Sequence, residues 1–424
     1  MKFLRAYRVL LSQPAASWLA VSAIATRLPT PLLSLGFLLT FQERSGSYTQ
    51  AGLLWTAYSV AYAVGVPITG QLVDRMGPRP VLLGCLAGYV PAFAAILIAL
   101  SADAPLAVLI PVVALLGACT PPAGPLIRGS WPAIVPADRL QSAFALDAVI
   151  TEAVLIAGPV VVSGLVAFAT PVIALVLGGA SMVGGTALLL AAAPIKEWER
   201  RDGLSRRRGL RAIGSPGLRV LFLIVFFDIV AYGCLVVGII ATATDQHARS
   251  ASGVLLSLVS VGVVAGGIVY GGRSWPGSAR AQLSILYAAG AVILAAAAVS
   301  GLGLLALGTV FVLLGIIGGP RDALLYLMLG KAAPPEYRTV TFAWVSTITW
   351  ASYGLGTALG GQLVSFSNGS GYLALLITAV GNACAAAIAL RVREIPATDT
   401  PTGAEAGEEA PPIVAAEADR DPKT

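Results

Sequence analysis

The residues of this sequence with the clearest chemical potential are charged side chains inside long apolar stretches. Glu152 stands in LDAVITEAVLIAGP, Asp228 in VFFDIVAYG, and Arg27 in ATRLPTP. A charge near the centre of a bilayer costs at least about 2.5–3.5 kcal/mol on insertion scales, so it usually faces a cavity or a partner. A carboxyl group in such a place can bind and release a proton near neutral pH. Glu152 and Asp228 are therefore the first candidates for proton coupling.

The depth of these charges follows from the rise of an α-helix. Glu152 lies about 20 Å beyond Arg139, at about 1.5 Å per residue, which is mid-depth. Asp147 is shallower and about 140° around the helix from Glu152, so the two acids are not expected to share one proton. Asp147 is a third candidate for proton coupling. Asp228 and Arg27 each lie about 14 Å into their own apolar runs.

One further pair of charges, Arg321 and Asp322, follows GIIGGP in a later apolar run. Adjacent helical residues diverge by about 100°, so one of the two can face a cavity while the other meets a neighbouring helix. Both can equally lie near enough to the end of the run to escape the lipid. The only histidine, His247, stands in the polar stretch DQHARS, which argues against a histidine relay inside the membrane.

Aromatic residues form a second pattern. Trp55, Tyr58 and Tyr62 are spaced i, i+3, i+7, and a later run contains Trp344 and Trp350. Such a stripe either packs against a neighbouring helix or lines a cavity. If it lines a cavity, it suits a hydrophobic or cationic organic molecule.

The composition indicates that the elements positioning these residues lie in a membrane. Of 424 residues, 57% are hydrophobic and only 11% are charged, whereas soluble proteins are about 25% charged. The net charge of +6 comes from basic residues in short loops, which indicates topology rather than nucleic-acid binding. The four cysteines lie inside apolar runs without metal-ligand spacing, so we expect no disulfide, metal or cofactor.

Crossing a bilayer as a helix takes about 20 apolar residues. The sequence contains twelve such runs and predicts an all-α membrane protein. The expected spans are 18–41, 50–72, 80–100, 105–128, 141–166, 171–193, 218–241, 251–271, 281–300, 302–330, 340–365 and 371–391.

The distribution of Lys and Arg predicts how these spans face. If the N-terminus is inside, 23 of the 27 basic residues are cytoplasmic, Arg44 and Arg249 are outside, and Arg27 and Arg321 fall within spans. This asymmetry follows the positive-inside rule, so both termini are expected in the cytoplasm. Arg-rich, Ala-rich and Gly-rich composition favours a bacterial source, and hence the bacterial cytoplasmic membrane.

The charge distribution along the chain also predicts its domain organisation. The charged stretch 194–217 divides the chain into an N-terminal half, 1–193, and a C-terminal half, 218–395. The tail, 396–424, is rich in Pro, Ala and acidic residues, a composition typical of disorder. The halves repeat at an offset of about 199 residues, as VPADRLQSAFA and PPEYRTVTFAW show. Two repeated halves are typical of secondary transporters, whose substrate site lies between them.

The loop between the second and third spans reads GQLVDRMGPRPVLL. It resembles the signature loop of the major facilitator superfamily, with pattern Gly, any, Leu, any, Asp, Arg, any, Gly, basic, basic. Pro78 replaces the first residue of the final basic pair. The residues that match are Gly70, Leu72, Asp74, Arg75, Gly77 and Arg79.

The resemblance implies a gating role for this loop. In the family the loop latches the two halves together in the outward-facing state, which would involve Asp74, Arg75 and Arg79. Alternatively, the two arginines only enforce the topology. Gly70 would let a neighbouring helix approach, Gly77 would permit a tight turn, and Asp74 suits the N-terminus of a partner helix.

The same resemblance implies a central cavity lined by the first helix of each half. Arg27, Asp228, Arg321, Asp322, Tyr58, Tyr62 and Trp344 are the expected lining residues. Arg27 and Asp228 occupy nearly equivalent places in those two helices, so a pair between them is geometrically possible. Many proton-coupled drug exporters of the superfamily carry a basic residue at the middle of the fourth span. Here the only charge in that span, Arg128, is expected toward its cytoplasmic end.

A weaker resemblance concerns the fifth span. Gly158 and Pro159, followed by Gly164, are similar to the Gly-Pro motif of the antiporter branch, although Val154 stands where the motif has a glycine. Proline bends a helix, and small residues let the bend pack closely. An antiporter motif and ordinary small-residue packing are both compatible with these residues.

The leading hypothesis is a proton antiporter that exports small organic molecules, drug-like compounds or secondary metabolites. The alternative is an uptake symporter or a facilitator, with Arg27 selecting an organic anion. Amide side chains are nearly absent from the spans, which argues against sugars. A membrane enzyme has no support, because no phosphate loop, metal cluster or buried histidine occurs. The expected partners are a small-molecule substrate, protons and lipid, without nucleic acid, and the default for the family is a monomer.

Overall fold

The structure, a computed structural model, describes residues 2–45, 48–168, 170–191, 215–248, 251–273 and 275–392. These residues form α-helices joined by turns, and no β-strand occurs among them. Nearly all of the predicted linker 194–217 and the whole of the predicted tail 396–424 lie outside the described residues. The helices are α1 (Lys2–Leu11), α2 (Pro14–Arg27), α3 (Pro29–Ser45), α4 (Tyr48–Met76), α5 (Pro78–Ser101), α6 (Leu106–Ala118), α7 (Ala123–Ile134), α8 (Leu140–Phe168), α9 (Val172–Ala191), α11 (Pro216–Asp245), α12 (Ala251–Gly271), α13 (Ala279–Val299), α14 (Leu304–Ala332), α15 (Arg338–Phe366) and α16 (Tyr372–Ala389).

Eleven stretches of the described chain are helical, long and apolar enough to cross a membrane, one fewer than the sequence predicts. The difference is α15, which corresponds to the expected span 340–365. This helix has 29 residues and is therefore about 43 Å long, but it is rich in Ser, Thr and Gly. Its length thus fits a span, while no stretch of it is as apolar as the other eleven candidate spans.

Two expected spans are each interrupted by proline. The first expected span divides into α2 and α3, which meet at Leu28 directly before Pro29. The fourth divides into α6 and α7, and the break contains Pro121 and Pro122. Proline lacks an N–H group and disfavours the helical conformation in the residue before it. The corresponding helices of the second repeat, α11 and α14, are continuous.

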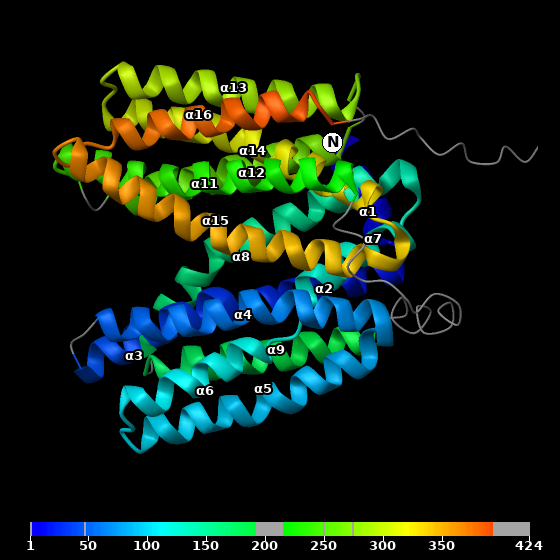
Figure 1. The fold of residues 1–424 in the computed structure, drawn as a ribbon, viewed down its shortest axis with the longest axis vertical. Coiled ribbons are helices and arrows are strands. Elements are labelled where there is room, and N and C mark those ends of the chain that lie inside the picture. The colour runs from blue at the N-terminus through cyan, green and yellow to red at the C-terminus, as the bar shows by residue number, and fades with distance from the viewer. Residues whose placement is uncertain are drawn as a thin grey trace, which may run out of the picture.

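The helices gather in two groups, shown in Figure 1. We call α2–α7 with α9 the N-terminal bundle and α11–α16 the C-terminal bundle. α8 runs obliquely between them and packs against α2 and α3 on one side and α12 and α14 on the other. α15 packs against α4 and α7 as well as α11. The boundaries predicted between 193 and 218 fall at residues that the structure mostly does not describe, so the division into halves stays a prediction.

The sequence repeat has a local counterpart in the structure. The two repeated segments each form a 3₁₀ turn, Ala137–Arg139 and Pro335–Tyr337, and each turn is followed by a helix of 29 residues. Gly117 and Gly315, which occupy equivalent positions in the two repeats, also have similar surroundings. A Cβ on Gly117 would lie 2.3 Å from the carbonyl oxygen of Tyr58, and one on Gly315 would lie 2.1 Å from that of Val259. Both glycines therefore allow close helix contact.

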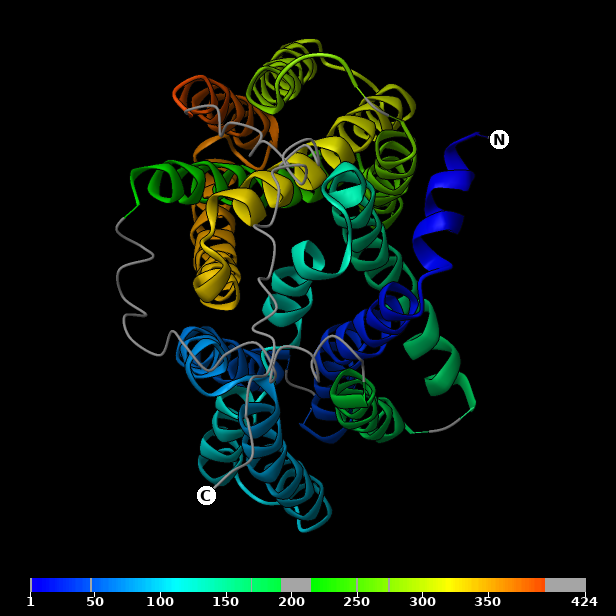
Figure 2. The same cartoon turned by 90° about the vertical axis from the view of Figure 1, so that its right-hand side faces the viewer.

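Hydrogen bonds join the N-terminal bundle and α8 to the C-terminal bundle at one end of the helices, the end that faces the viewer in Figure 2. Near the end of α4, Asp74 Oδ2 accepts a hydrogen bond of 2.8 Å from Val340 N in the first turn of α15. At the start of α8, Gln141 Nε2 donates to the carbonyl oxygens of Tyr270 and Arg273 at 2.8 and 3.0 Å. We call this region the closed end.

The N-terminal helix α1 reinforces the closed end from outside the bundles (Figure 2). The Tyr7 hydroxyl donates to the carbonyl oxygens of Gly267 and Ile268 in α12, at 2.9 and 3.2 Å. Burial raises the pKa of this hydroxyl, so it remains a hydrogen-bond donor at neutral pH. The helix that precedes the N-terminal bundle is thereby attached to the C-terminal bundle.

Candidate functional site

Of two neighbouring cavities, the larger lies where α8 and α15 pass between the bundles, and the smaller lies mainly among the helices of the C-terminal bundle. The larger has a volume of about 530 Å³ and the smaller about 200 Å³. The cavities share a wall, so they are adjacent. The residues common to both linings are Leu155, Ile229, Tyr232, Tyr326 and Thr349.

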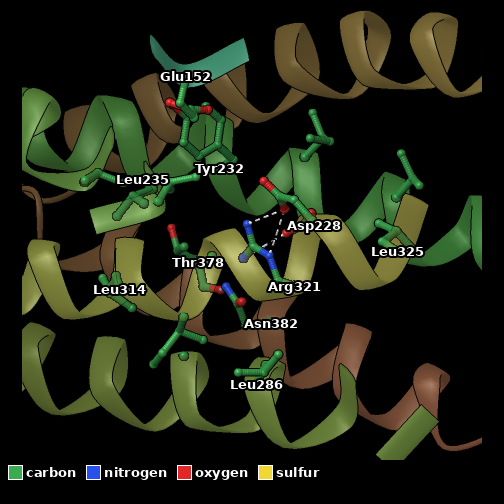
Figure 3. Close-up of a pocket in the computed structure, with 18 of the residues that line it drawn as sticks. Glu152, Asp228, Tyr232, Leu235, Leu286, Leu314, Arg321, Leu325, Thr378 and Asn382 are labelled. Carbon is green, nitrogen blue, oxygen red and sulfur yellow. Dashed lines mark hydrogen bonds and ion pairs between the residues drawn. The ribbon is translucent and has the colours of Figure 1, made fainter. Parts of the chain in front are cut away.

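Three of the four acids that the sequence singles out, Glu152, Asp228 and Asp322, line the smaller cavity, and Figure 3 labels the first two. Arg321 lies between two carboxylates: its Nη1 is 3.1 Å from Asp228 Oδ1, and its Nε is 3.3 Å from Asp322 Oδ1. We call Asp228, Arg321 and Asp322 the acidic cluster. Glu152 reaches the same cavity from α8. With two carboxylates and one guanidinium, the cluster has one formal negative charge in excess when all groups are ionised.

Arg321 and Asp322 both line this cavity, so neither escapes to the end of the helix. Adjacent residues of a helix point in directions about 100° apart. The side chain of Arg321 is long enough to turn back, so that its guanidinium still contacts Asp322. The guanidinium of Arg321 also lies 5.2 Å from the ring centroid of Tyr287. This arrangement is a cation–π contact beneath the ion pair.

A second charged cluster lies beside the larger cavity. Asp147 Oδ1 is 2.6 Å from Arg27 Nη2, and its Oδ2 is 2.9 Å from Arg128 Nε. We call Arg27, Asp147 and Arg128 the basic cluster, because it holds two cations and one anion. Asp147 is fully buried, and each of its oxygens is occupied by a guanidinium donor. Its geometry is thus that of a carboxylate that positions two arginines.

The pair considered possible between Arg27 and Asp228 does not form, because each residue has a partner elsewhere. Arg27 is the last residue of α2, which packs against α7, α8 and α9. Asp228 lies on α11, which packs against α14, α15 and α16 as well as α12. Equal depth therefore does not bring the two together, because the first helix of each repeat packs mainly among helices of its own bundle.

Arg128 is a lining residue that the sequence interpretation missed. The expected span ends at 128, but α7 continues to Ile134, which places Arg128 about 9 Å inside the end of the helix. Its guanidinium lies 4.2 Å from the ring centroid of Tyr326. The stretch GSWPAIV after Arg128 is still apolar. This stretch was the feature of the sequence that could have shown that the helix continues past Arg128. If Arg128 is counted as a residue of the span and not of a cytoplasmic loop, the excess of basic residues on the cytoplasmic side remains.

The aromatic stripe of α4 lines the larger cavity through Trp55, Tyr58 and Tyr62. Their rings are stacked, with centroids 5.0 Å apart for the first pair and 6.1 Å for the second. Trp344 lines neither of these two cavities, whereas Trp350 lines the larger one. Six residues turn a helix by about 600°, so the two tryptophans lie about 120° apart.

The gating-loop residues lie at the closed end. A Cβ on Gly70 would be 2.7 Å from Ala343 Cβ, and Gly77 has a φ of +87°. Asp74 makes the contact with α15 described above, and the partly buried Leu72 packs against the core. The close approach of α4 to α15 and the turn after α4 thus both depend on glycine.

The two arginines of the loop, Arg75 and Arg79, have exposed side chains. Neither forms an ion pair with another residue of the described chain. Of the three residues that the resemblance implies as a latch, Asp74 alone contacts the C-terminal bundle among the described residues.

The helix-bend residues of the fifth span, Gly158, Pro159 and Gly164, all lie within α8. A Cβ on Gly158 would lie 2.3 Å from Pro31 Cβ in α3, whereas nothing lies within 4 Å of the Gly164 position. Close packing against α3 therefore accounts for Gly158. Among the described residues, no group of three or more His, Cys, Asp or Glu side chains could hold a metal ion.

Comparisons with known proteins extend these observations. A family model described as Major Facilitator Superfamily matches residues 16–320. No curated protein matches the chain. Three solved structures cover nearly the same extent. The human organic anion transporter MFSD10 (TETRAN) is 15% identical with a TM-score of 0.68, covering 89% of this chain and 99% of its own.

Two further structures are similar over the same helices. A bacterial homologue of the iron transporter ferroportin, in its outward-facing state, is 16% identical with a TM-score of 0.70, covering 89% of this chain and 98% of its own. The E. coli fucose:proton symporter FucP is 15% identical with a TM-score of 0.65, covering 90% and 99%.

At such low identities the solved structures support the fold alone, which is the all-helical fold with its paired helical bundles. The family model covers most of the chain, including the gating loop and both charged clusters except Asp322 and Arg321. From the fold and this match, the chain belongs to the Major Facilitator Superfamily, as a multi-pass secondary transporter of small molecules rather than an enzyme.

Proposed function

We propose that this transporter exports a small organic molecule through the larger cavity in exchange for protons that bind at the smaller cavity. The observation that carries the proposal is the separation of charge between the cavities. Glu152, Asp228 and Asp322 line the smaller cavity, while no acidic side chain in the described part of the chain lines the larger one. Proton binding and substrate binding would thus occur at neighbouring places across a shared wall.

The helix α8 supplies a physical link between the two cavities. Asp147 and Glu152 are five residues apart, or about 140° around the helix. Asp147 accordingly holds the basic cluster of the larger cavity, while Glu152 enters the smaller one. A movement of α8 would change both sites together, which is what coupled transport requires.

The closed end fits one state of an alternating-access cycle. We infer that it is the cytoplasmic end, because the positive-inside rule places the loop after α4 in the cytoplasm. The structure would then be an outward-facing state held by Asp74 and by Gln141. The bacterial cytoplasmic membrane, cytoplasmic termini and a monomer are parts of the same proposal. Export, rather than uptake, rests on the Gly-Pro motif.

The test is proton movement in liposomes that hold a pH-sensitive dye. Wild type would be compared with Glu152→Gln and Asp228→Asn, using ethidium, chloramphenicol and salicylate as probes under an imposed proton gradient. A matched control is Asp138→Asn, whose side chain is 76% exposed. We expect probe-dependent proton movement out of the acidic compartment that falls at least tenfold in one or both acid variants.

The direction of proton movement distinguishes the alternatives. Protons moving opposite to the probe support antiport, and protons moving with the probe support the symporter alternative. Probe flux without proton movement, unchanged in both acid variants, would show a facilitator. In that case Glu152 and Asp228 would serve only to hold helices together.

A further inference from the structure

We propose that the substrate of the larger cavity is an organic anion whose carboxylate binds between Arg27 and Arg128, with its flat apolar part against the aromatic residues of α4. This inference rests on the proposed function, in that the larger cavity is taken as the substrate site. It narrows the substrate to a chemical class. It also gives Asp147 the role of a positioning residue instead of a proton carrier.

The charge of the cavity wall supports an anion. Among the described residues that line the larger cavity, only Arg27 and Arg128 are charged. Asp147, which partly neutralises them, is fully buried behind the guanidinium groups and does not line the cavity. One positive charge in excess therefore faces the cavity. Such a space favours an anion and repels an organic cation.

The hydrogen-bonding capacity of the two arginines points the same way. A guanidinium has five N–H donors, and each arginine uses only one nitrogen to contact Asp147. Arg27 Nη1 is buried and has no hydrogen-bond partner in the described part of the chain. A buried donor without a partner is costly. A carboxylate fits this need, because its two oxygens match the donors of a guanidinium.

The two guanidinium groups are held in place before any ligand arrives. Asp147 binds both of them, and the ring of Tyr326 lies 4.2 Å from the guanidinium carbon of Arg128. Neither arginine has a side chain more than 13% exposed. Little side-chain entropy would be lost on binding, which is the advantage of a preorganised site.

The remainder of the cavity suits an apolar body with flat faces. Trp55, Tyr58 and Tyr62 line it from α4, and Trp350 and Tyr353 line it from α15. A volume of about 530 Å³ lies within the usual range for a site that holds one drug-sized molecule. The aromatic residues, taken alone, would also suit a cation. The two arginines decide against that choice.

Three matched probes test the charge preference: 2-naphthoate, 2-naphthamide and 2-naphthylmethylamine, which share a ring and differ in charge. Binding of each to the full-length protein in lipid nanodiscs would be measured by calorimetry, without a proton gradient. We expect saturable binding of the naphthoate and at least tenfold weaker binding of the amide and the amine. In Arg128→Gln we expect naphthoate binding to weaken about 10- to 100-fold, the usual loss for a charged hydrogen bond.

Two further variants control for charge and for folding. Arg128→Lys keeps the charge but loses the forked donors, so we expect an intermediate loss. Arg139→Gln replaces a more exposed arginine outside the cavity and should bind naphthoate as wild type does. If Arg128→Gln does not fold, the preference of the wild type for naphthoate still decides the question.

Equal binding of the three probes, or a preference for the amine, would overturn the anion proposal. Naphthoate binding that is unchanged in a folded Arg128→Gln would overturn it as well. These outcomes are separate from a failure of proton coupling, because the binding measurement uses no gradient and leaves Glu152 and Asp228 intact. A carboxylate-specific site without proton-coupled flux would sustain this inference and reject antiport.

Discussion

Beside the larger cavity a carboxylate lies between two arginines, whereas beside the smaller cavity an arginine lies between two carboxylates. The two clusters are built alike in other respects. Each includes a guanidinium over a tyrosine ring, at 4.2 Å for Arg128 and Tyr326 and 5.2 Å for Arg321 and Tyr287. Similar packing thus surrounds opposite net charges.

The difference matters because the two kinds of cluster respond differently to protons. Arginine remains protonated in proteins, so the charge of the basic cluster is fixed by Arg27 and Arg128. A carboxyl group can be neutralised by a proton, so the charge of the acidic cluster can change through Asp228 and Asp322. A fixed positive charge suits the recognition of an anion, while a variable negative charge suits the uptake and release of protons.

The largest expected effect comes from Asp147→Asn, which removes the only anion of the basic cluster. Two buried arginines would remain without their counter-charge, and neither can neutralise itself by losing a proton. We expect a loss of about 3–5 kcal/mol in stability, the usual cost of breaking a buried ion pair. The loss should be the same at pH 5.5 and pH 8. Thermal unfolding of the purified protein in detergent measures it.

The matched control for this change is Asp138→Asn, because Asp138 is exposed and lies 3.9 Å from Arg139. An exposed pair contributes about 0–1 kcal/mol, so its melting temperature should stay near that of wild type. Equal losses in the two variants would contradict the structural role assigned to Asp147.

The next effect comes from Arg321→Gln, which removes the only cation of the acidic cluster. Asp228 and Asp322 would then face each other without a counter-charge, but protonation can relieve them. We expect a loss of about 1–3 kcal/mol at pH 8, the cost of an unsatisfied buried group, and a smaller loss at pH 5.5. Thermal unfolding at both pH values measures the difference.

This second prediction is contradicted if the loss in Arg321→Gln does not depend on pH. The two clusters would then behave alike, and the contrast between fixed and variable charge would lose its support. A loss of stability in Asp147→Asn that depends on pH would likewise contradict the contrast between fixed and variable charge.

How far the sequence alone could lead is clear from the charged residues. It placed Glu152 and Asp228 within membrane-spanning runs, because a charge in an apolar run has a strong compositional signal. For Arg321 and Asp322 it left open a place facing a cavity or at the end of the run. The family, the helical fold and eleven of twelve spans also followed from motif and hydropathy. These features depend on local composition, which a single sequence records directly.

Which charges pair was not predictable in the same way. Pairing depends on how each helix is rotated and where it is interrupted, as the breaks at Leu28 and at Pro121–Pro122 show. The place of Arg128 in the cavity wall was missed because the end of its helix was set six residues early. Which of Trp344 and Trp350 lines the larger cavity depends on a helix rotation that the sequence does not give. Such features arise from tertiary packing, so depth alone could not supply them.

The smallest expected effect concerns the ring beneath Arg128. Tyr326→Leu removes the cation–π contact of the basic cluster, and we expect a loss of about 0.5–2 kcal/mol in stability. Tyr326→Phe keeps the ring and should lose much less, so the difference between the two variants isolates the contact. Because Tyr326 lines both cavities, the same pair of variants would be tested for 2-naphthoate binding. Weaker binding in Tyr326→Leu alone would show that the ring positions Arg128, whereas equal binding would assign that task to Asp147.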